Sequence, residues 1–376
     1  MMAEDRVMSA WPNRKLLDLL QIEIPIIQAP MAGSDSVALA RSVCSAGALG
    51  SLACALLGAD RIRDAARAIR QDMQRPFNLN FFCHAMEPPD SAALERWKSF
   101  LRPLYERLAL DIDAVPESRL RLPFDEEVCE VVEEALPEVV SFQFGLPAAR
   151  LIDRLKKRGI KVLGAATSTQ EAKWLEDHGC DAIIAQGSEA GGHRAMFLET
   201  NVAAQVGLFA LLPQVVDAVS VPVIAAGGIA DARGIVAAFA LGGCGVQIGT
   251  AYLLCPEAEI SPSYRRALEN VADTGTAITN LFSGRPARGI ANRYMNEAGP
   301  LSEAAPAFPY AATFVAPLRA ASERAGSLDY MQLWAGQAAQ LATAMPADEL
   351  TRKLAIEALQ PFKPDSAADK ALGSVS

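Results

Sequence analysis

The stretch that decides the fold is residues 181–194, which read DAIIAQGSEAGGHR. It begins with a short apolar run, turns polar at Gln186, and continues through two glycines to His193. A buried strand that ends in polar residues, glycines and an imidazole has the layout of an active-site edge in an α/β barrel, because the carboxyl ends of the strands carry the site there. The rest of the chain repeats this order of apolar strand, polar end and helix.

Eight short apolar segments recur along the chain, mostly separated by segments with helical spacing. Strands that read as continuous apolar runs are typical of a parallel sheet covered on both faces. Eight such units predict a TIM (β/α)8 barrel rather than an open doubly wound sheet. No G-x-G-x-x-G follows a strand, so the dinucleotide fingerprint of a Rossmann fold is missing. The predicted strands are residues 24–28, 48–54, 77–82, 139–144, 160–166, 181–186, 221–226 and 245–251.

The barrel is predicted to occupy residues 14–255. Within it, residues 85–136 are predicted to form an insertion after the third strand, because prolines and charges break the rhythm there. Residues 256–318 contain Ala, Pro and polar residues without strand runs, which indicates a smaller, mostly helical subdomain on the substrate side. Residues 319–362 are predicted to be a C-terminal helical segment that packs back onto the barrel, with a helix at about 327–343.

Composition excludes several classes of protein. Of the 376 residues 51% are hydrophobic, which is enough for a large core, and the formal net charge of −9 argues against nucleic acid or an anionic membrane as a partner. We expect no membrane span, since no apolar run reaches the required length of about 20 residues, and the first residues lack the apolar core of a secretory signal. The seven cysteines include no C-x-x-C pair and lie mostly in apolar segments. The prediction is a soluble cytoplasmic protein, either a monomer or a homodimer.

Polar residues and glycines gather at the ends of the predicted strands. The last two strands end in glycine-bearing turns, where barrels commonly bind phosphate through backbone N–H groups. Neutral amides at other strand ends can bind the polar edge of a flat heterocycle without adding charge. Together these features predict flavin mononucleotide (FMN), although the glycines alone are also explained by tight turns. The predicted cofactor-binding residues are Pro30, Met31, Ala32, Gly33, Asn80, Gln186, Gly191, Gly192, Gly227, Gly228, Gln247, Ile248, Gly249 and Thr250.

Of the three histidines, His193 is the predicted catalytic residue. It follows two glycines at a strand end, and an imidazole has a suitable pKa to remove a proton from a carbon acid near neutral pH. His178 is predicted to lie on the surface, and the role of His84 is left open, as is that of Glu189. No metal site is predicted, because there is no H-x-x-x-H and no His/Cys cluster.

Six segments together resemble the nitronate monooxygenases, and two of them look most like the class I branch. The six are PIIQAPMAG (25–33), FNLNFFCH (77–84), QGSEAGGHR (186–194), PVIAAGGIAD (222–231), QIGTAYL (247–253) and YMQLWAGQ (330–337). The resemblance implies bound FMN, and oxidation of alkyl nitronates, and of neutral nitroalkanes, by O₂ to a carbonyl compound and nitrite. It implies that His193 is the general base. It also implies that residues 334–337 close the far side of the flavin ring.

Two alternatives remain open from the sequence. The same fold and FMN could serve an NAD(P)H oxidoreductase of the enoyl reductase or quinone reductase type, although the sequence offers no separate nicotinamide fingerprint. A barrel that binds a phosphate ligand without redox chemistry is the third hypothesis. Tyr294 and Tyr310 are only candidates for the substrate pocket.

Overall fold

The computed structural model describes residues 11–115 and 120–362. Its centre is an eight-stranded parallel sheet with the strand order β1-β9-β8-β6-β5-β4-β3-β2. A parallel bridge between Ile27 and Leu49 joins the two ends of this order, so the sheet closes into a barrel. The predicted TIM barrel is therefore confirmed, and each predicted strand forms. The barrel strands are β1 (Ile26–Gln28), β2 (Gly50–Ala53), β3 (Phe77–Phe82), β4 (Val139–Gln143), β5 (Lys161–Ala166), β6 (Ala182–Gln186), β8 (Val223–Ala226) and β9 (Gly245–Ile248).

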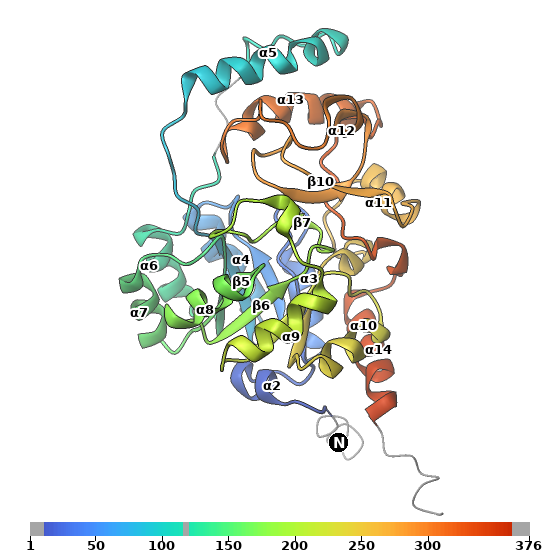
Figure 1. The fold of residues 1–376 in the computed structure, drawn as a ribbon. Coiled ribbons are helices and arrows are strands. Elements are labelled where there is room, and N and C mark those ends of the chain that lie inside the picture. Colours follow the sequence, from blue (N-terminus) through green and yellow to red (C-terminus); the bar gives the residue numbers. More distant parts are fainter. Residues whose placement is uncertain (1–10, 116–119, 363–376) are drawn as a thin grey trace, which may run out of the picture.

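Helices surround the barrel on its outside, as Figure 1 shows. Several begin at a side chain that accepts a hydrogen bond from the backbone of the first turn, as Ser36, Ser168 and Asp231 do. The predicted strand at 245–251 is shorter than expected, because the chain turns into a short 3₁₀ helix, η2 (Thr250–Leu254), at the barrel mouth. The surrounding helices are α3 (Val37–Ser45), α4 (Ala59–Arg70), α6 (Glu126–Ala135), α7 (Ala149–Lys157), α8 (Thr169–Asp177), α9 (Leu208–Ala218), α10 (Ala232–Ala240) and α14 (Ala347–Leu359).

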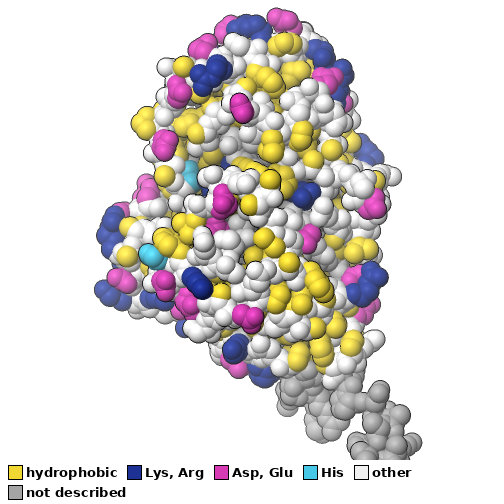
Figure 2. Space-filling view, in the orientation of Figure 1, with side chains coloured by type: hydrophobic (Ala, Val, Ile, Leu, Met, Phe, Trp, Pro, Cys, Tyr) yellow, Lys and Arg dark blue, Asp and Glu magenta, His cyan; other side chains and the backbone are white. Residues whose placement is uncertain are grey.

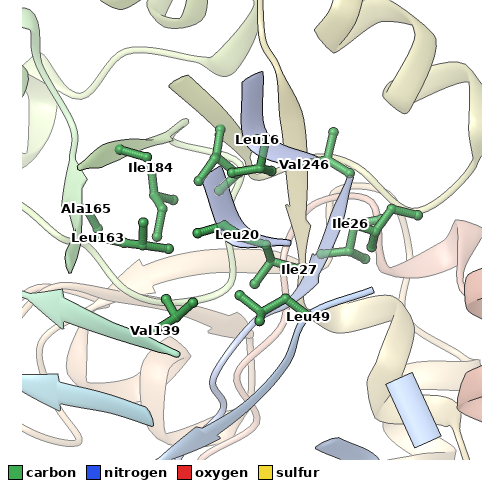
Figure 3. Close-up of a cluster of buried hydrophobic side chains, with 14 of the residues drawn as sticks. Leu16, Leu20, Ile26, Ile27, Leu49, Val139, Leu163, Ala165, Ile184 and Val246 are labelled. Carbon is green, nitrogen blue, oxygen red and sulfur yellow. The ribbon is translucent and has the colours of Figure 1, made fainter. Parts of the chain in front are cut away.

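The barrel core joins the inner strands to a helix at the amino ends of the strands, α2 (Lys15–Leu20). Figure 3 shows Leu16 and Leu20 of this helix among Ile26, Ile27 and Val246 of the strands. Leu16 and both isoleucines are completely buried. Because this end of the barrel is filled with apolar side chains, a ligand can enter only at the opposite, carboxyl end.

A smaller unit covers the carboxyl end and contains an antiparallel sheet that the sequence did not predict. Its strands are β10 (Thr276–Thr279), β11 (Ala287–Ile290) and β7 (Gly192–His193), in the order β10-β11-β7. Residues 256–318 therefore contain two strands in addition to the helices expected there. The helices of this unit are α11 (Pro262–Glu269), α12 (Arg293–Ala298) and α13 (Ala311–Arg324). Because β7 pairs with β11, the unit is joined directly to the strand that carries His193.

The insertion at 85–136 divides between the two units. Its first helix, α5 (Ser91–Arg107), lies on α13 in Figure 1, and Trp97 Nε1 donates a hydrogen bond to the carbonyl of Ala311 at 3.3 Å. Its second helix, α6, packs instead against the barrel through Cys129, Val131 and Val132. We therefore propose that the cap comprises α5 together with the 256–318 segment, and that α6 is one of the barrel's own helices.

The helix predicted at about 327–343 is wrong. The chain is mostly irregular there: Trp334 bridges to Gly289, and Gly336 N–H donates to Thr250 Oγ1 at 3.0 Å. Only a single turn of 3₁₀ helix, η3 (Ala339–Leu341), forms. These tertiary bonds replace those that a helix would make within itself. The expected packing back onto the barrel is made by α14, whose Leu350, Leu354 and Leu359 belong to the barrel core.

Two kinds of feature are missing from residues 11–115 and 120–362. No helix among them combines the length and the apolar character needed to cross a bilayer. Nor do they bring together three or more His, Cys, Asp or Glu side chains that could hold a metal ion.

Candidate active site

A cleft lies at the carboxyl end of the barrel, between the strand ends and the cap. The space between its atoms, counted together with the open solvent at its mouth, is about 1250 Å³. Strand ends, the 190–193 turn, the η2 segment and residues 332–338 all contribute to it. The side chains and backbone that line it are mainly small, apolar or neutral and polar.

All but two of the predicted site residues line this cleft. The exceptions are Gly33 and Ile248. Ile248 is buried in the barrel core, because its side chain points away from the strand end that its neighbours expose. Gly33 has a φ of 81° and forms a tight turn just outside the cleft. The residues placed in the cleft are Pro30, Met31, Ala32, Asn80, Gln186, Gly191, Gly192, His193, Gly227, Gly228, Gln247, Gly249 and Thr250.

The ends of β8 and β9 offer unused backbone donors. Gly227 and Gly228 have φ values of 107° and 69°, a backbone conformation that favours glycine. The N–H groups of Gly228, Gly249 and Thr250 donate no hydrogen bond to any acceptor in the described part of the chain. Backbone donors without acceptors at the ends of two adjacent strands are suited to bind a phosphate.

The amide side chains divide into two kinds. Gln186 is held by the chain itself: Nε2 donates to the carbonyl of His193 at 3.1 Å, and Oε1 accepts from Ala195 N–H at 2.8 Å. Asn80 Nδ2 donates to Ser141 Oγ at 2.9 Å, which leaves its Oδ1 able to accept from a ligand. Gln247 Oε1 is buried and has no partner within the described residues. A buried amide oxygen without a donor costs free energy, so a ligand N–H or O–H is expected at this position.

His193 lies in a box of aromatic rings. The centroids of Phe82, Phe144, Phe308 and Trp334 are 5.6–6.1 Å from that of its imidazole. Its Nε2 is 2.8 Å from Ser283 Oγ. The backbone is fixed as well, because the carbonyl of His193 accepts from both Gln143 and Gln186.

This environment keeps the imidazole neutral. Burial lowers the pKa of His193 well below its usual value, and the nearby positive charges of Arg121 and Arg285, and then His84, lower it further. A neutral imidazole with an anchored ring nitrogen and a fixed backbone is equipped to accept a proton from a ligand in the cleft.

The comparisons with known proteins agree with this geometry. Residues 13–357 match the family model described as nitronate monooxygenase. The chain belongs to the nitronate monooxygenase family. A protein called nitronate monooxygenase from Paraburkholderia phytofirmans (strain DSM 17436 / LMG 22146 / PsJN) is 44% identical over 93% of this chain and 96% of its own length. The family assignment makes this chain an enzyme, a flavin-dependent oxidoreductase.

Two solved structures are similar to this chain over nearly its whole length. The nitroalkane oxidase from Streptomyces ansochromogenes superposes with a TM-score of 0.82 at 36% identity, covering 95% of this chain and 99% of that one. FabK from Thermotoga maritima superposes with a TM-score of 0.69 at 28% identity, covering 96% of this chain and 99% of that one.

Several residues of this family member's cleft were not found by sequence reasoning. Tyr264 comes from the cap and Arg121 from the insertion, and both line the cleft. Ser283 and Phe308 also come from the cap and contact His193, although they do not line the cleft. None of these positions follows a predicted barrel strand, so only the folded chain brings them to the strand ends. The candidate tyrosines do not line the cleft: Tyr294 is buried in the cap core, and the Tyr310 hydroxyl donates to the carbonyl of Glu87.

The structure shows the contacts of the other two histidines and of Glu189. His84 packs edge-on against Phe308 at 4.7 Å, outside the cleft lining, and burial lowers its pKa to about 4. Glu189 accepts a hydrogen bond from Leu208 N–H, at the start of α9, at 2.8 Å. His178 is exposed, which confirms the prediction that it lies on the surface, and its ring stacks on Trp174.

The turn that presents His193 is held by a buried arginine, Arg194. Its side chain is fully buried and donates to the carbonyls of Gly187 at 2.8 Å and Gln186 at 2.9 Å. Its Nε also donates to Gln205 Oε1 at 3.0 Å. Three hydrogen bonds from one guanidinium therefore join both sides of the turn between β6 and β7.

Replacing Arg194 with methionine should destabilise the protein by about 2–4 kcal/mol, because the buried carbonyls of Gln186 and Gly187 each lose a charged donor. Lysine at the same position keeps the charge but not the planar fork, so we expect an intermediate loss. Thermal unfolding of the flavin-loaded enzyme measures the change. Arg67→Met is the matched control, since Arg67 is a largely exposed helix residue paired only with Asp64. Equal effects of the two methionine variants would contradict the role given to Arg194.

Proposed function

We propose that this protein is a class I nitronate monooxygenase that binds FMN and oxidises alkyl nitronates, and also neutral nitroalkanes, to a carbonyl compound and nitrite with O₂. The observation that carries the proposal is the neutral, anchored imidazole of His193 beside unused phosphate-binding donors in one cleft. The 44% identity to a protein called nitronate monooxygenase supports the substrate class.

The donors in the cleft fit an FMN. Its phosphate would bind the N–H groups of Gly228, Gly249 and Thr250, and its ring would lie along residues 30–32. Asn80 Oδ1 and Gln247 Oε1 would accept from the single N–H of the oxidised ring and from a ribityl hydroxyl, and one N–H of Gln186 Nε2 remains for the cofactor. When bound, the flavin accepts electrons from the substrate and passes them to O₂.

His193 would act on the substrate. Ser283 Oγ lies 3.3 Å from the carbonyl oxygen of Arg285 and can donate its proton to it. The Ser283 hydroxyl oxygen is then the acceptor for Nε2–H of His193. In that tautomer Nδ1 carries the free lone pair and removes the α-proton of a neutral nitroalkane. A nitronate has already lost this proton, so His193 would only orient it. The surrounding aromatic rings contribute to the burial that keeps the imidazole neutral.

Other properties follow as predictions. All seven cysteines are free thiols, which supports a reducing compartment such as the cytoplasm. The choice between monomer and homodimer stays open to measurement by size-exclusion chromatography with light scattering.

A visible spectrum tests the proposal most directly. We expect the purified protein to be yellow, or to become so with added FMN, and anaerobic alkyl nitronate to bleach the flavin band while NADH does not. Bleaching by NADH alone would instead support the NAD(P)H oxidoreductase alternative. A protein that stays colourless after incubation with FMN would exclude both flavin functions and leave the phosphate-binding barrel.

A further inference from the structure

Arg121 is the only charged side chain among the residues that line the cleft in the described part of the chain. Its guanidinium carbon lies 6.0 Å from the centre of the Phe308 ring, and this ring lies 5.6 Å from the ring of His193. Arg121 is thus the one cation among the described residues that line the cleft, while Arg285 lies near His193 outside that lining.

Phe308 is an aromatic neighbour of this guanidinium, but among residues 11–115 and 120–362 no Asp or Glu forms an ion pair with it. Within the same residues its side chain donates no hydrogen bond. Three other arginines around the site differ in this respect. Arg194 and Arg288 are bonded to backbone carbonyls, and Arg285 donates to the carbonyl of Met196. Burial lowers the pKa of Arg121 to about 10, so it remains a cation at neutral pH.

A partly desolvated cation without a counter-ion is costly unless an anion joins it. The two oxygens of a nitronate lie in one plane and share a negative charge, which matches the planar fork of a guanidinium. The chain carries a formal net charge of −9, and Figure 2 shows acidic and basic side chains interspersed on the visible face. Attraction for an anion therefore has to come from within the cleft.

We propose that Arg121 binds the negative charge of the nitronate and makes the cleft selective for the ionised substrate over the neutral nitroalkane. The inference rests on the proposed function, because it assigns a residue to that substrate. Arg121 binds the nitro oxygens while His193 faces the carbon that has lost, or is to lose, its proton.

The test compares Arg121→Gln and Arg121→Lys with the flavin-loaded wild type. Removing a charge-assisted hydrogen bond should raise KM for an alkyl nitronate by about 10- to 100-fold, with a smaller change in kcat. Lysine should recover part of this loss, since it keeps the charge without the fork. KM for the neutral nitroalkane should change less. The control is Arg102→Gln, which removes an equal charge from an exposed site on α5, and it should leave KM within twofold.

A second measurement does not depend on turnover. Nitrate is a planar anion of similar shape, and calorimetric titration should show that it binds the wild type at least tenfold more tightly than Arg121→Gln. Unchanged nitronate KM and unchanged nitrate affinity in a well-folded Arg121→Gln enzyme would overturn the inference while the proposed function stands. If the wild type does not oxidise nitronates, the proposed function fails, and the nitrate titration still decides whether Arg121 forms an anion site.

Discussion

Replacing His193 with asparagine is expected to lower kcat/KM for a neutral nitroalkane by about 10²- to 10⁴-fold, the range typical of a lost general base. Activity on a preformed nitronate should fall far less, because that substrate needs no proton removed. Asparagine keeps a polar side chain of similar size, so bound flavin should stay near the wild-type level. Steady-state rates of nitrite release on the two forms of one substrate provide the comparison. Similar losses on both forms would show that His193 is not the base.

The pH dependence gives the same prediction a second readout. The pKa of His193 is lowered by burial and by Arg121 and Arg285, so the folded enzyme keeps the imidazole neutral through pH 6.5 and below. The acidic limb of kcat/KM for a neutral nitroalkane should therefore lie well below pH 6.5. In the unfolded chain the His193 imidazole takes up a proton near pH 6.5, whereas in the folded enzyme it does so only at lower pH. The contribution of His193 to folding stability is therefore present above pH 6.5 and is lost as the pH falls towards the pKa of the folded state. His178→Asn, at an exposed position, should leave the pH profile unchanged.

The barrel could be predicted because its strands are continuous apolar runs, such as residues 182–185 and 223–226. Burial on both faces imposes that pattern, so it is visible without knowing any partner strand. The cap lacks such a signal. The strand at 276–279 is only half-buried and pairs with one that contains a charged residue, Arg288. It pairs with β11, which in turn pairs with β7, and β7 lies far away in the sequence.

The same distinction separates the parts of the site. Asn80, Gln186 and Gln247 lie in the last part of recognisable strands, so their place at the barrel mouth follows from the fold. Ser283 and Arg121 lie in connecting segments, and their position depends on how the cap and the insertion fold over the barrel. At residues 327–343 a helix was predicted that does not form. Their composition favours a helix, but Trp334 bridges to Gly289 and Gly336 N–H donates to Thr250 Oγ1 instead. Local propensity is outweighed where tertiary hydrogen bonds are available.

The glycine pair before His193 is expected to respond unequally to alanine. At Gly191 an added Cβ would lie 2.6 Å from the backbone nitrogen of Gly336 and 2.7 Å from the carbonyl carbon of Ala335. Both are backbone atoms, so the 335–336 segment would have to move away. At Gly192 a Cβ meets nothing within 4 Å, but the φ of 73° is unfavourable for alanine. The first glycine is needed for space and the second for its backbone conformation.

Gly191→Ala should therefore be the more damaging change. Moving residues 335–336 also breaks the bond from Gly336 N–H to Thr250 Oγ1, beside the donors assigned to the phosphate. A displacement of about 1 Å near a reacting centre can cost about 10²-fold in rate, and we expect at least that loss together with weaker FMN retention. Gly192→Ala should cost only about 1 kcal/mol of stability, from backbone strain. Flavin-to-protein ratio, melting temperature and nitronate turnover measure the three effects.

Gly58→Ala is the control, since a Cβ there meets nothing within 4 Å and its φ of −83° suits any residue. Equal flavin retention in Gly191→Ala and Gly192→Ala would mean that the contact between the His193 turn and residues 335–336 does not shape the cofactor site.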